Sequence, residues 1–414
     1  MGDNKILYSI YTGGFPNQAE GGPNNIIYKI IKNNPSENYH FDYLSSDIFF
    51  EGINKNNLVT IGDKRAVKKR VTSILYEKSW IYRKIFSSDF YLPFHFKKKE
   101  KYFKRIADLM KEYDIIHSQD SVSLALLETS EFSNTKKIIT VHSKGPLSNE
   151  LKYMAKNEFL RKKIDKELKK LERVSVGIAD VITFPSVAAK KIFEKNLDLS
   201  LENKRTKIIY NGIDIPEILN IGNIDIFNKY LIKKTDYEII LLNVGAHVKE
   251  KRIDVLLKVT NVLINKFKKK VLLINIGKGT DSQYLSDLVD KLNIRSNVMF
   301  LGQIPNSDVI SFMKATDLFI MTSEKVIFDL VVLEALACGT CCVVSNDGGN
   351  KEIIKDGVNG FLIDTDDVEE IARKIISILP YRNSVRENAL RTAKQFSVDR
   401  MVNEYFELYE SLLK

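Results

Sequence analysis

Short runs of apolar residues alternate along the chain with longer segments in which apolar residues recur about every three to four positions. The short runs have the length of β-strands, and the longer segments have the spacing of amphipathic α-helices. This alternation is typical of βα units, in which helices cover both faces of a parallel sheet. In the first half of the chain it predicts strands at Lys5–Tyr11, Asp114–His117, Lys137–His142, Asp180–Phe184 and Lys207–Tyr210.

A second series of strands begins after the middle of the chain. It is predicted at Glu238–Val244, Val271–Ile276, Asn297–Leu301, Asp317–Met321 and Cys341–Ser345. Between the two series, the segment Asp214–Asp236 has weak periodicity and contains Pro216 and Gly222, so we interpret it as an interdomain linker. The 414 residues suffice for two domains, each with its own core. We therefore expect an α/β chain of two doubly wound, Rossmann-like domains that face a central ligand cleft at the carboxyl ends of their strands.

The predicted strand Asp317–Met321 precedes a loop and a helix that suit an anionic ligand. This helix begins near Asp329, where backbone N–H groups without helical partners and the helix dipole favour negative charge. Glu334 lies about one turn into the helix, and its carboxylate can accept hydrogen bonds from sugar hydroxyls. The pattern therefore indicates a site for an anionic ligand that carries hydroxyl groups.

With the turn Gly348-Gly349-Asn350-Lys351-Glu352, this stretch resembles the nucleotide-sugar site of GT4-like retaining glycosyltransferases, which have the GT-B fold. The resemblance implies that Glu334 holds the nucleotide ribose. It also implies contact of the donor with the segment Phe328, Asp329, Leu330 and Val331.

The resemblance also implies a division of the chain. It implies a Rossmann-like acceptor domain at residues 1–215 and a nucleotide-sugar donor domain at 216–395. The helical segment 396–414 is then expected to cross back and pack on the first domain.

One residue of the family's site is missing. Similar proteins carry a second glutamate, followed by Gly-Phe-Gly, eight positions before the residue that Glu334 matches, and here Val326 stands in its place. Asp329 replaces the last glycine of that motif, and Glu324 lies two positions too early. Asp329 would repel a diphosphate unless it points away or binds a sugar hydroxyl. Both an altered donor pocket and the loss of activity therefore remain open.

Basic residues follow the strand that ends at Gly245. In similar glycosyltransferases an arginine and a lysine hold the diphosphate, and Lys251 matches this lysine while Ala246 replaces the arginine. His247 or Arg252 could compensate, and a solvated basic face is the alternative.

A glycine turn follows the next predicted strand. Gly277-Lys278-Gly279 looks like the turn that supports the nucleotide base in similar proteins, since glycine permits positive φ and close backbone approach. An ordinary turn without a ligand is the alternative.

Two features of the first half are similar to the acceptor side of the family. Gly21 and Gly22 precede a helix at Ile26–Ile31 and match a Gly-Gly loop that reaches a phosphate or the acceptor. His142, at a strand end, matches a histidine beside the reacting sugar, although a lone histidine is often structural. His117 is ambiguous between these roles.

The composition, 44% apolar and 28% charged, is that of a globular protein. The N-terminus lacks the pattern of a signal peptide, and no window approaches the ~20 apolar residues of a spanning helix, so we expect a cytoplasmic protein. The cysteines Cys338, Cys341 and Cys342 are interpreted as buried small hydrophobes rather than as metal ligands or disulfide partners. The resemblance to GT4-like glycosyltransferases implies a reaction without a metal ion, and we expect no cofactor beyond the nucleotide sugar.

The net charge is +10, and basic residues mixed with aromatic ones crowd residues 64–105, with a second basic run at 161–170. Such segments suit an anionic bilayer surface, so peripheral binding to the inner face of the plasma membrane is expected. Nucleic acid binding, which we do not expect, and a solvated face are the alternatives. The sequence leaves the oligomeric state open.

The resemblance implies transfer of a sugar from a nucleotide sugar to a hydroxyl of a glycan or lipid-linked acceptor, with retention of configuration. A UDP-sugar is favoured as donor, with a GDP-sugar as the alternative. Lys251 and His142 are the candidate catalytic residues. Two further classes stay open: a non-catalytic GT-B-like partner or chaperone of another glycosyltransferase, and a nucleotide-sugar epimerase.

Overall fold

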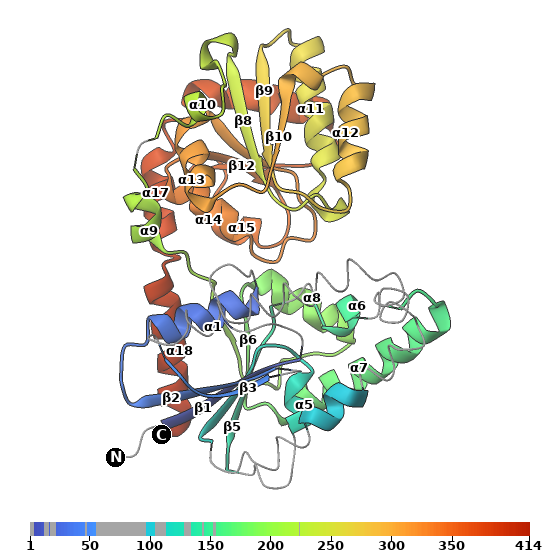
Figure 1. The fold of residues 1–414 in the computed structure, drawn as a ribbon, viewed down its shortest axis with the longest axis vertical. Helices are drawn as coiled ribbons and strands as arrows, with labels where there is room; N and C mark the ends of the chain where they lie inside the picture. Colours follow the sequence, from blue (N-terminus) through green and yellow to red (C-terminus); the bar gives the residue numbers. More distant parts are fainter. Residues whose placement is uncertain are drawn as a thin grey trace. The chain divides into compact units, whose positions relative to one another are not determined.

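The computed structural model describes residues 4–11, 16, 22–45, 48–54, 97–103, 113–127, 134–142, 145–151, 155–222 and 224–414. The chain forms two compact units, one of Met1–Tyr210 with Met401–Lys414 and one of Asn211–Arg400. Each unit is a sheet with helices packed against it (Figure 1). The α/β architecture expected from the alternating pattern is confirmed, because both sheets are built mainly of parallel strands.

The first unit contains a seven-stranded sheet in the order β3-β2-β1-β4-β5-β6-β7. Its strands are β1 (Asn4–Ile10), β2 (Tyr39–Ser45), β3 (Ile48–Ile53), β4 (Ile115–Ser118), β5 (Lys136–Thr140), β6 (Val181–Phe184) and β7 (Thr206–Ile208). Only the edge pair of β2 and β3 is antiparallel among these neighbours. The described helices of this unit include α1 (Pro23–Lys32), α5 (Ser123–Leu127), α6 (Ser148–Leu151), α7 (Glu158–Ile178) and α8 (Val187–Leu197). The sequence predicted five of these strands and missed β2 and β3.

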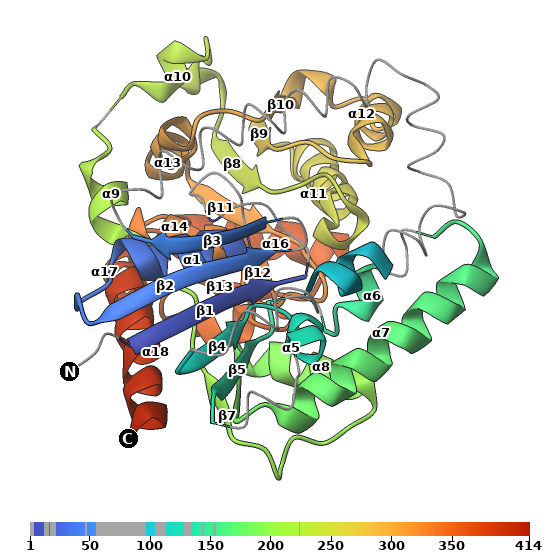
Figure 2. The same ribbon diagram turned by 60° about the horizontal axis from the view of Figure 1, so that its bottom comes forward.

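The last helix, α18 (Val398–Leu413), begins in the second unit and packs mainly on the first. Figure 2 shows it beside the strands of the first sheet. The Tyr409 hydroxyl lies 2.8 Å from the Tyr8 hydroxyl and 2.8 Å from His117 Nδ1, and all three side chains are buried. The expected crossing of the terminal helix is therefore confirmed. His117 serves to hold this helix, with its other nitrogen 2.6 Å from Thr140 Oγ1.

The second unit contains a six-stranded sheet in the order β10-β9-β8-β11-β12-β13, and every neighbouring pair is parallel. Its strands are β8 (Ile239–Val244), β9 (Val271–Ile276), β10 (Val298–Gly302), β11 (Leu318–Met321), β12 (Cys341–Ser345) and β13 (Phe361–Ile363). The longer helices are α11 (Ile253–Asn265), α12 (Ser282–Lys291), α13 (Asn306–Ala315), α14 (Leu330–Ala337), α16 (Val368–Ile378) and α17 (Arg386–Lys394). Short helical turns complete it: η4 (Lys249–Lys251), η5 (Arg295–Asn297), α15 (Asn350–Ile353) and η6 (Leu379–Tyr381).

Helices on both faces bury the central strands of this sheet, whereas the edge strands β10 and β13 are partly exposed. Every residue of β9 is buried, as is every residue of β12, which explains why both appear in the sequence as nearly continuous apolar runs. Residues of α11 and α16 pack against one face of the sheet and complete the core. The cysteines lie in this interior, and burial raises the pKa of the Cys338 and Cys341 thiols to about 12. They are unpaired small hydrophobes, as predicted.

The prediction of an interdomain linker at Asp214–Asp236 is wrong. This segment folds as part of the second unit into α9 (Ile215–Asn220), α10 (Ile226–Lys229) and η3 (Lys234–Asp236). Its helices are too short to show a period. The side chains of Asp214 and Asp225 nevertheless cap them, accepting hydrogen bonds from backbone N–H groups, and these cap signals could have revealed them.

Within the described part of the chain, no helix is both long and apolar enough to cross a bilayer. Of the basic and aromatic segment 64–105, the structure describes residues 97–103, which are helical. The rest of the segment lies outside the described residues.

Candidate functional site

The candidate site lies at the carboxyl edge of the second sheet. The order of the strands reverses between β8 and β11, and ligands of doubly wound sheets bind beside such a reversal. Lys251 follows β8, and Asp329 follows β11 directly before α14. The chain therefore brings these two residues together at the position where this fold most often holds a ligand.

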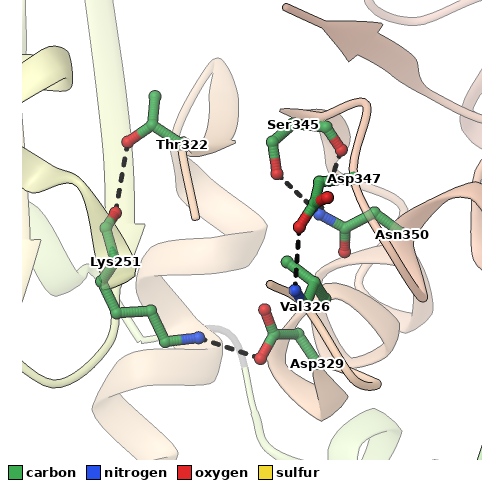
Figure 3. A network of polar contacts seen from close by, with 7 residues as sticks. All are labelled: Lys251, Thr322, Val326, Asp329, Ser345, Asp347 and Asn350. Carbon is green, nitrogen blue, oxygen red and sulfur yellow. Dashed lines mark hydrogen bonds and ion pairs between the residues drawn. The ribbon is translucent and has the colours of Figure 1, made fainter. Parts of the chain in front are cut away.

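Lys251 forms an ion pair with Asp329, with 2.9 Å between Nζ and Oδ1 (Figure 3). The stem of Lys251 lies over Gly245, where a β-carbon would be 3.7 Å from Lys251 Cδ. Thr322 donates a hydrogen bond to the Arg252 carbonyl at 2.8 Å, which ties η4 to the loop after β11. The loops that follow β8 and β11 thus hold the Lys251 ammonium group at the edge of the sheet.

Asp329 occupies the cap position before α14, but its side chain forms no cap. It turns to Lys251 instead, with 21% of its side chain exposed. Its second oxygen, Oδ2, is buried and has no hydrogen-bond partner in the described part of the chain. A buried carboxylate oxygen without a partner is unfavourable, so this atom is suited to accept a hydrogen bond from a ligand. Asp329 therefore does not point away from the site.

The segment that replaces the family's glutamate is packed into the protein. Val326 is buried, and its backbone N–H donates to Asp347 Oδ2 at 2.9 Å. A β-carbon at Gly348 would lie 1.9 Å from the Val326 carbonyl oxygen, so only glycine fits there. The Phe328 ring is buried 5.6 Å from the ring of Phe396. Its side chain therefore belongs to the core, and only its backbone remains available for the donor contact we predicted.

The helix α14 begins at Leu330 and Val331 and carries Glu334, which is half-buried, in its second turn. Its first amide groups and Glu334 come from the same short helix. A phosphate at its start and a hydroxylated group beside Glu334 are the ligand chemistry that this helix can accommodate.

The loops after β8 and β9 touch through glycines. Gly277 has a φ of 139° and donates its N–H to the Gly302 carbonyl at 2.8 Å. A β-carbon at Gly277 would lie 1.9 Å from the Gly245 carbonyl oxygen. Glycine is therefore required at this position both for the backbone angle and for the contact.

The structure does not support His247 as a replacement for the missing arginine. Its ring is buried, with Nδ1 2.8 Å from Ser282 Oγ and Nε2 2.6 Å from Asn275 Oδ1. Both nitrogens thus have partners inside the unit. Arg252 directs Nη1 to Thr365 Oγ1 at 3.0 Å. The ammonium of Lys251 is therefore the cation that the structure places beside Asp329.

The first unit has its own polar cluster at the ends of β4 and β5. His142 Nε2 lies 2.8 Å from Gln119 Oε1, and burial lowers the pKa of His142 to about 4, although the residue as a whole is only partly buried. The imidazole is therefore neutral near pH 7. Gly22, with a φ of 71°, directly precedes α1, and Gly21 lies outside the described residues.

The sequence interpretation missed Glu172. This glutamate continues the buried stripe of α7 and is fully buried. It accepts hydrogen bonds from Ser121 Oγ at 2.7 Å and from the Ser148 N–H at 3.2 Å, so it joins the loops after β4 and β5. Burial raises its pKa to about 7. A glutamate four positions after Leu168 on an apolar stripe is the signal that could have identified it.

Two family descriptions match this chain. Residues 61–217 match "Glycosyltransferase Family 4", and residues 224–396 match "Glycosyl transferases group 1". The chain therefore belongs to the GT4-like family of GT-B proteins, as the motifs indicated.

Relatives of known activity are matched over part of their length. N-acetyl-alpha-D-glucosaminyl L-malate synthase of Bacillus anthracis is 28% identical over 254 residues, which are 60% of this chain and 64% of the relative. D-inositol 3-phosphate glycosyltransferase of Salinispora arenicola is 35% identical over 137 residues, 32% of this chain and 31% of the relative. The chain thus spans less than two thirds of the length of either relative.

Solved structures resemble the whole fold. The Anabaena protein HepE, solved in complex with UDP, has a TM-score of 0.67 at 19% identity, with coverage of 98% of this chain and 100% of that one. Sucrose-phosphate synthase of Thermosynechococcus elongatus has a TM-score of 0.69 at 18% identity, with coverage of 99% of both chains. The fold is therefore GT-B, with two Rossmann-like domains.

Proposed function

We propose that this protein is a retaining glycosyltransferase that moves a hexosyl-type sugar from a nucleoside diphosphate sugar to a hydroxyl group. The observation that carries the proposal is the meeting of the Lys251 ammonium and the start of α14 beside the strand reversal of the second sheet. A fixed cation and helix amides at one position are what a leaving diphosphate requires.

In the proposed reaction, the sugar carbon gains positive charge while the diphosphate leaves. Lys251 exchanges the Asp329 carboxylate for the diphosphate, and the amides near Leu330 and Val331 stabilise the same charge. This preorganised electrostatic stabilisation is the main catalytic contribution that we invoke. Glu334 accepts hydrogen bonds from the ribose. His142, neutral near pH 7, is assigned to the reacting sugar.

A UDP-sugar is the favoured donor, with a GDP-sugar as the alternative. Support comes from HepE, which was solved with UDP and with UDP-glucose. Asp329 Oδ2 is our candidate to accept a hydrogen bond from a sugar hydroxyl, in place of the glutamate that Val326 replaces. In this proposal, the donor sugar is recognised by the carboxylate of Asp329, which lies three residues after Val326.

We place the acceptor, a lipid-linked or cell-envelope glycan, at the cytoplasmic face of the plasma membrane. Support comes from α7, where Lys163, Lys166 and Lys170 are exposed at helical spacing and follow Phe159, whose side chain is 79% exposed. A basic stripe with an exposed aromatic residue at one end fits an anionic bilayer surface.

A small anionic acceptor is the second candidate. The names of the two curated relatives specify L-malate and D-inositol 3-phosphate, which are small anions that carry hydroxyl groups.

The proposal is tested with a panel of UDP- and GDP-sugars, each combined with lipid-linked, malate and inositol phosphate acceptors. Donor binding is followed as protection against thermal unfolding, and product by mass spectrometry. We expect transfer from at least one donor, with retention shown by the product's anomeric NMR signal. Nucleotide binding without any transfer would instead indicate a non-catalytic partner, and conversion of the donor without acceptor an epimerase. Absence of nucleotide binding across the whole panel would disprove the proposal.

A further inference from the structure

A chain of hydrogen bonds crosses the interior of the second unit from β11 to β9. Asn243 donates from Nδ2 to the Ile320 carbonyl at 2.7 Å, and Asn275 donates from Nδ2 to Asn243 Oδ1 at 2.9 Å. Asn275 Oδ1 then faces His247 Nε2 at 2.6 Å. These three polar side chains are at most 3% exposed, among strands that are otherwise apolar.

The chain continues from His247 to the glycine turn. His247 Nδ1 lies 2.8 Å from Ser282 Oγ. The same hydroxyl oxygen lies 2.9 Å from the Gly279 carbonyl oxygen and accepts from the Gly279 N–H at 3.0 Å. The Gly279 N–H is thus held by a side chain that is itself held by His247.

Backbone contacts reinforce this connection. The Asp281 N–H donates to the His247 carbonyl at 2.9 Å, and a β-carbon at Gly279 would lie 2.4 Å from the same carbonyl oxygen. The ring of His247 also packs edge-on against Phe300, 5.6 Å between centroids. His247 therefore joins the loop after β8 to the loop after β9.

We propose that His247 is a positioning residue that sets nucleotide affinity by holding the turn Gly277–Gly279. This inference rests on the proposed function, in which that turn supports the base of the nucleotide. Because the Asn275 oxygen accepts, Nε2 of His247 carries a proton and donates, which leaves Nδ1 to accept a hydrogen bond from the Ser282 hydroxyl. Loss of the ring leaves Asn275 and Ser282 without their buried partner, and such loss is unfavourable.

The two hydrogen bonds of the His247 ring, to Ser282 and to Asn275, can be removed separately. His247→Asn places its amide where Nδ1 was and keeps the contact with Ser282, whereas His247→Gln places its amide where Nε2 was and keeps the contact with Asn275. His247→Leu removes both. Asn275→Leu and Asn359→Leu form a matched pair, because Asn359 is also a buried, hydrogen-bonded asparagine of this unit and contacts Ile353, Lys355 and Thr392 instead.

UDP affinity is measured by calorimetry, together with the melting temperature and hydrogen exchange at the amides of Gly279 and Asp281. We expect His247→Leu and His247→Gln to bind UDP about tenfold or more weakly, and His247→Asn to stay within about threefold of the wild type. Asn275→Leu should lose affinity, because the His247 ring then lacks the acceptor that fixes its orientation toward Ser282, whereas Asn359→Leu should lose stability alone. Exchange at Gly279 should accelerate in His247→Leu.

If His247 has a purely structural role, UDP affinity will fall together with the melting temperature, whichever of its two hydrogen bonds a variant keeps. That result, or unchanged exchange at Gly279 and Asp281 in His247→Leu, overturns the inference. If the wild type binds neither UDP nor any other nucleoside diphosphate, the proposed function fails, and the exchange measurement alone still decides whether His247 holds the turn.

Discussion

Lys251 Nζ lies 2.9 Å from Asp329 Oδ1, so the cation assigned to the donor diphosphate already has an anionic partner within its own unit. Both side chains are about one fifth exposed, at 22% and 21%. A diphosphate must displace a carboxylate before it can pair with Lys251. Asp329 is therefore an internal competitor of the nucleotide, as well as our candidate to recognise the sugar.

Removal of this competitor should strengthen binding of the free nucleotide. In Asp329→Ala, the Lys251 ammonium has no carboxylate partner and a nearby negative charge is gone, so UDP should bind about fivefold more tightly. Turnover or sugar selectivity should change, because a sugar contact is lost. Calorimetry with UDP and product analysis over the donor panel measure the two effects. Asp290→Ala, which removes an exposed charge from α12, should alter neither. Weaker UDP binding to Asp329→Ala would show that Asp329 does not compete with the diphosphate.

Glu334→Gln should weaken nucleotide binding through the ribose. Hydrogen bonds to an ionised acceptor are about twice as strong as neutral ones, and glutamine keeps the size while it removes the charge. Because UMP and UDP contain the same ribose, both should lose affinity by a similar factor. Lys251→Met should instead reduce UDP binding more than UMP binding, since its partner is the diphosphate. Unchanged UDP and UMP affinity in folded Glu334→Gln would contradict our placement of the ribose.

The sequence predicts strands where the run is almost entirely apolar and misses β2, where polar residues alternate with apolar ones. The bounds predicted for β9 agree with the structure because all six of its residues face a buried layer. In β2, His40 and Asp42 break the pattern. Asp42 is buried because Gly52, on the neighbouring strand, and Tyr113, 71 positions away, donate hydrogen bonds to it. A local pattern cannot show that a buried carboxylate will find such partners.

The candidate site shows the same limit. The sequence indicates that Lys251 and Asp329 both follow the ends of predicted strands, and parallel strands bring such ends together. The sequence does not show that the two side chains would pair across 78 positions, since this depends on the directions in which they leave the backbone. For the same reason His247 was assigned to the diphosphate, whereas Asn275 and Ser282 hold it in the interior.

Glu172→Gln should stabilise the protein at alkaline pH. Burial raises the pKa of Glu172 to about 7 from 4.5, so the folded protein retains this proton in a range where the unfolded chain has lost it. The contribution of Glu172 to stability is therefore complete below about pH 4.5 and falls as the pH rises through about 7. Glutamine keeps the acceptor for Ser121 and Ser148 without a charge. Relative to the wild type, the variant should gain about 1–3 kcal/mol between pH 5 and pH 8 in denaturant unfolding. An equal difference at both pH values would show that Glu172 does not titrate in this window.

The basic stripe of α7 should bind anionic vesicles. Lys163, Lys166 and Lys170 are exposed and form no ion pair within the described structure, whereas Lys162 of the same helix pairs with Glu158 at 3.0 Å. Each lysine near an anionic surface contributes about 1 kcal/mol, so replacing the three by glutamine should lower vesicle binding about a hundredfold at low salt.

The matched control replaces three exposed lysines of the second unit, Lys268, Lys270 and Lys291, by glutamine. It changes the net charge by the same amount and should leave sedimentation with phosphatidylserine vesicles almost unchanged. The α7 variant should also retain transfer to a soluble acceptor, because only its attachment to the surface is weakened. Equal losses in both variants would mean that net charge alone attracts the protein. Undiminished sedimentation of the α7 variant would exclude this helix as the membrane contact.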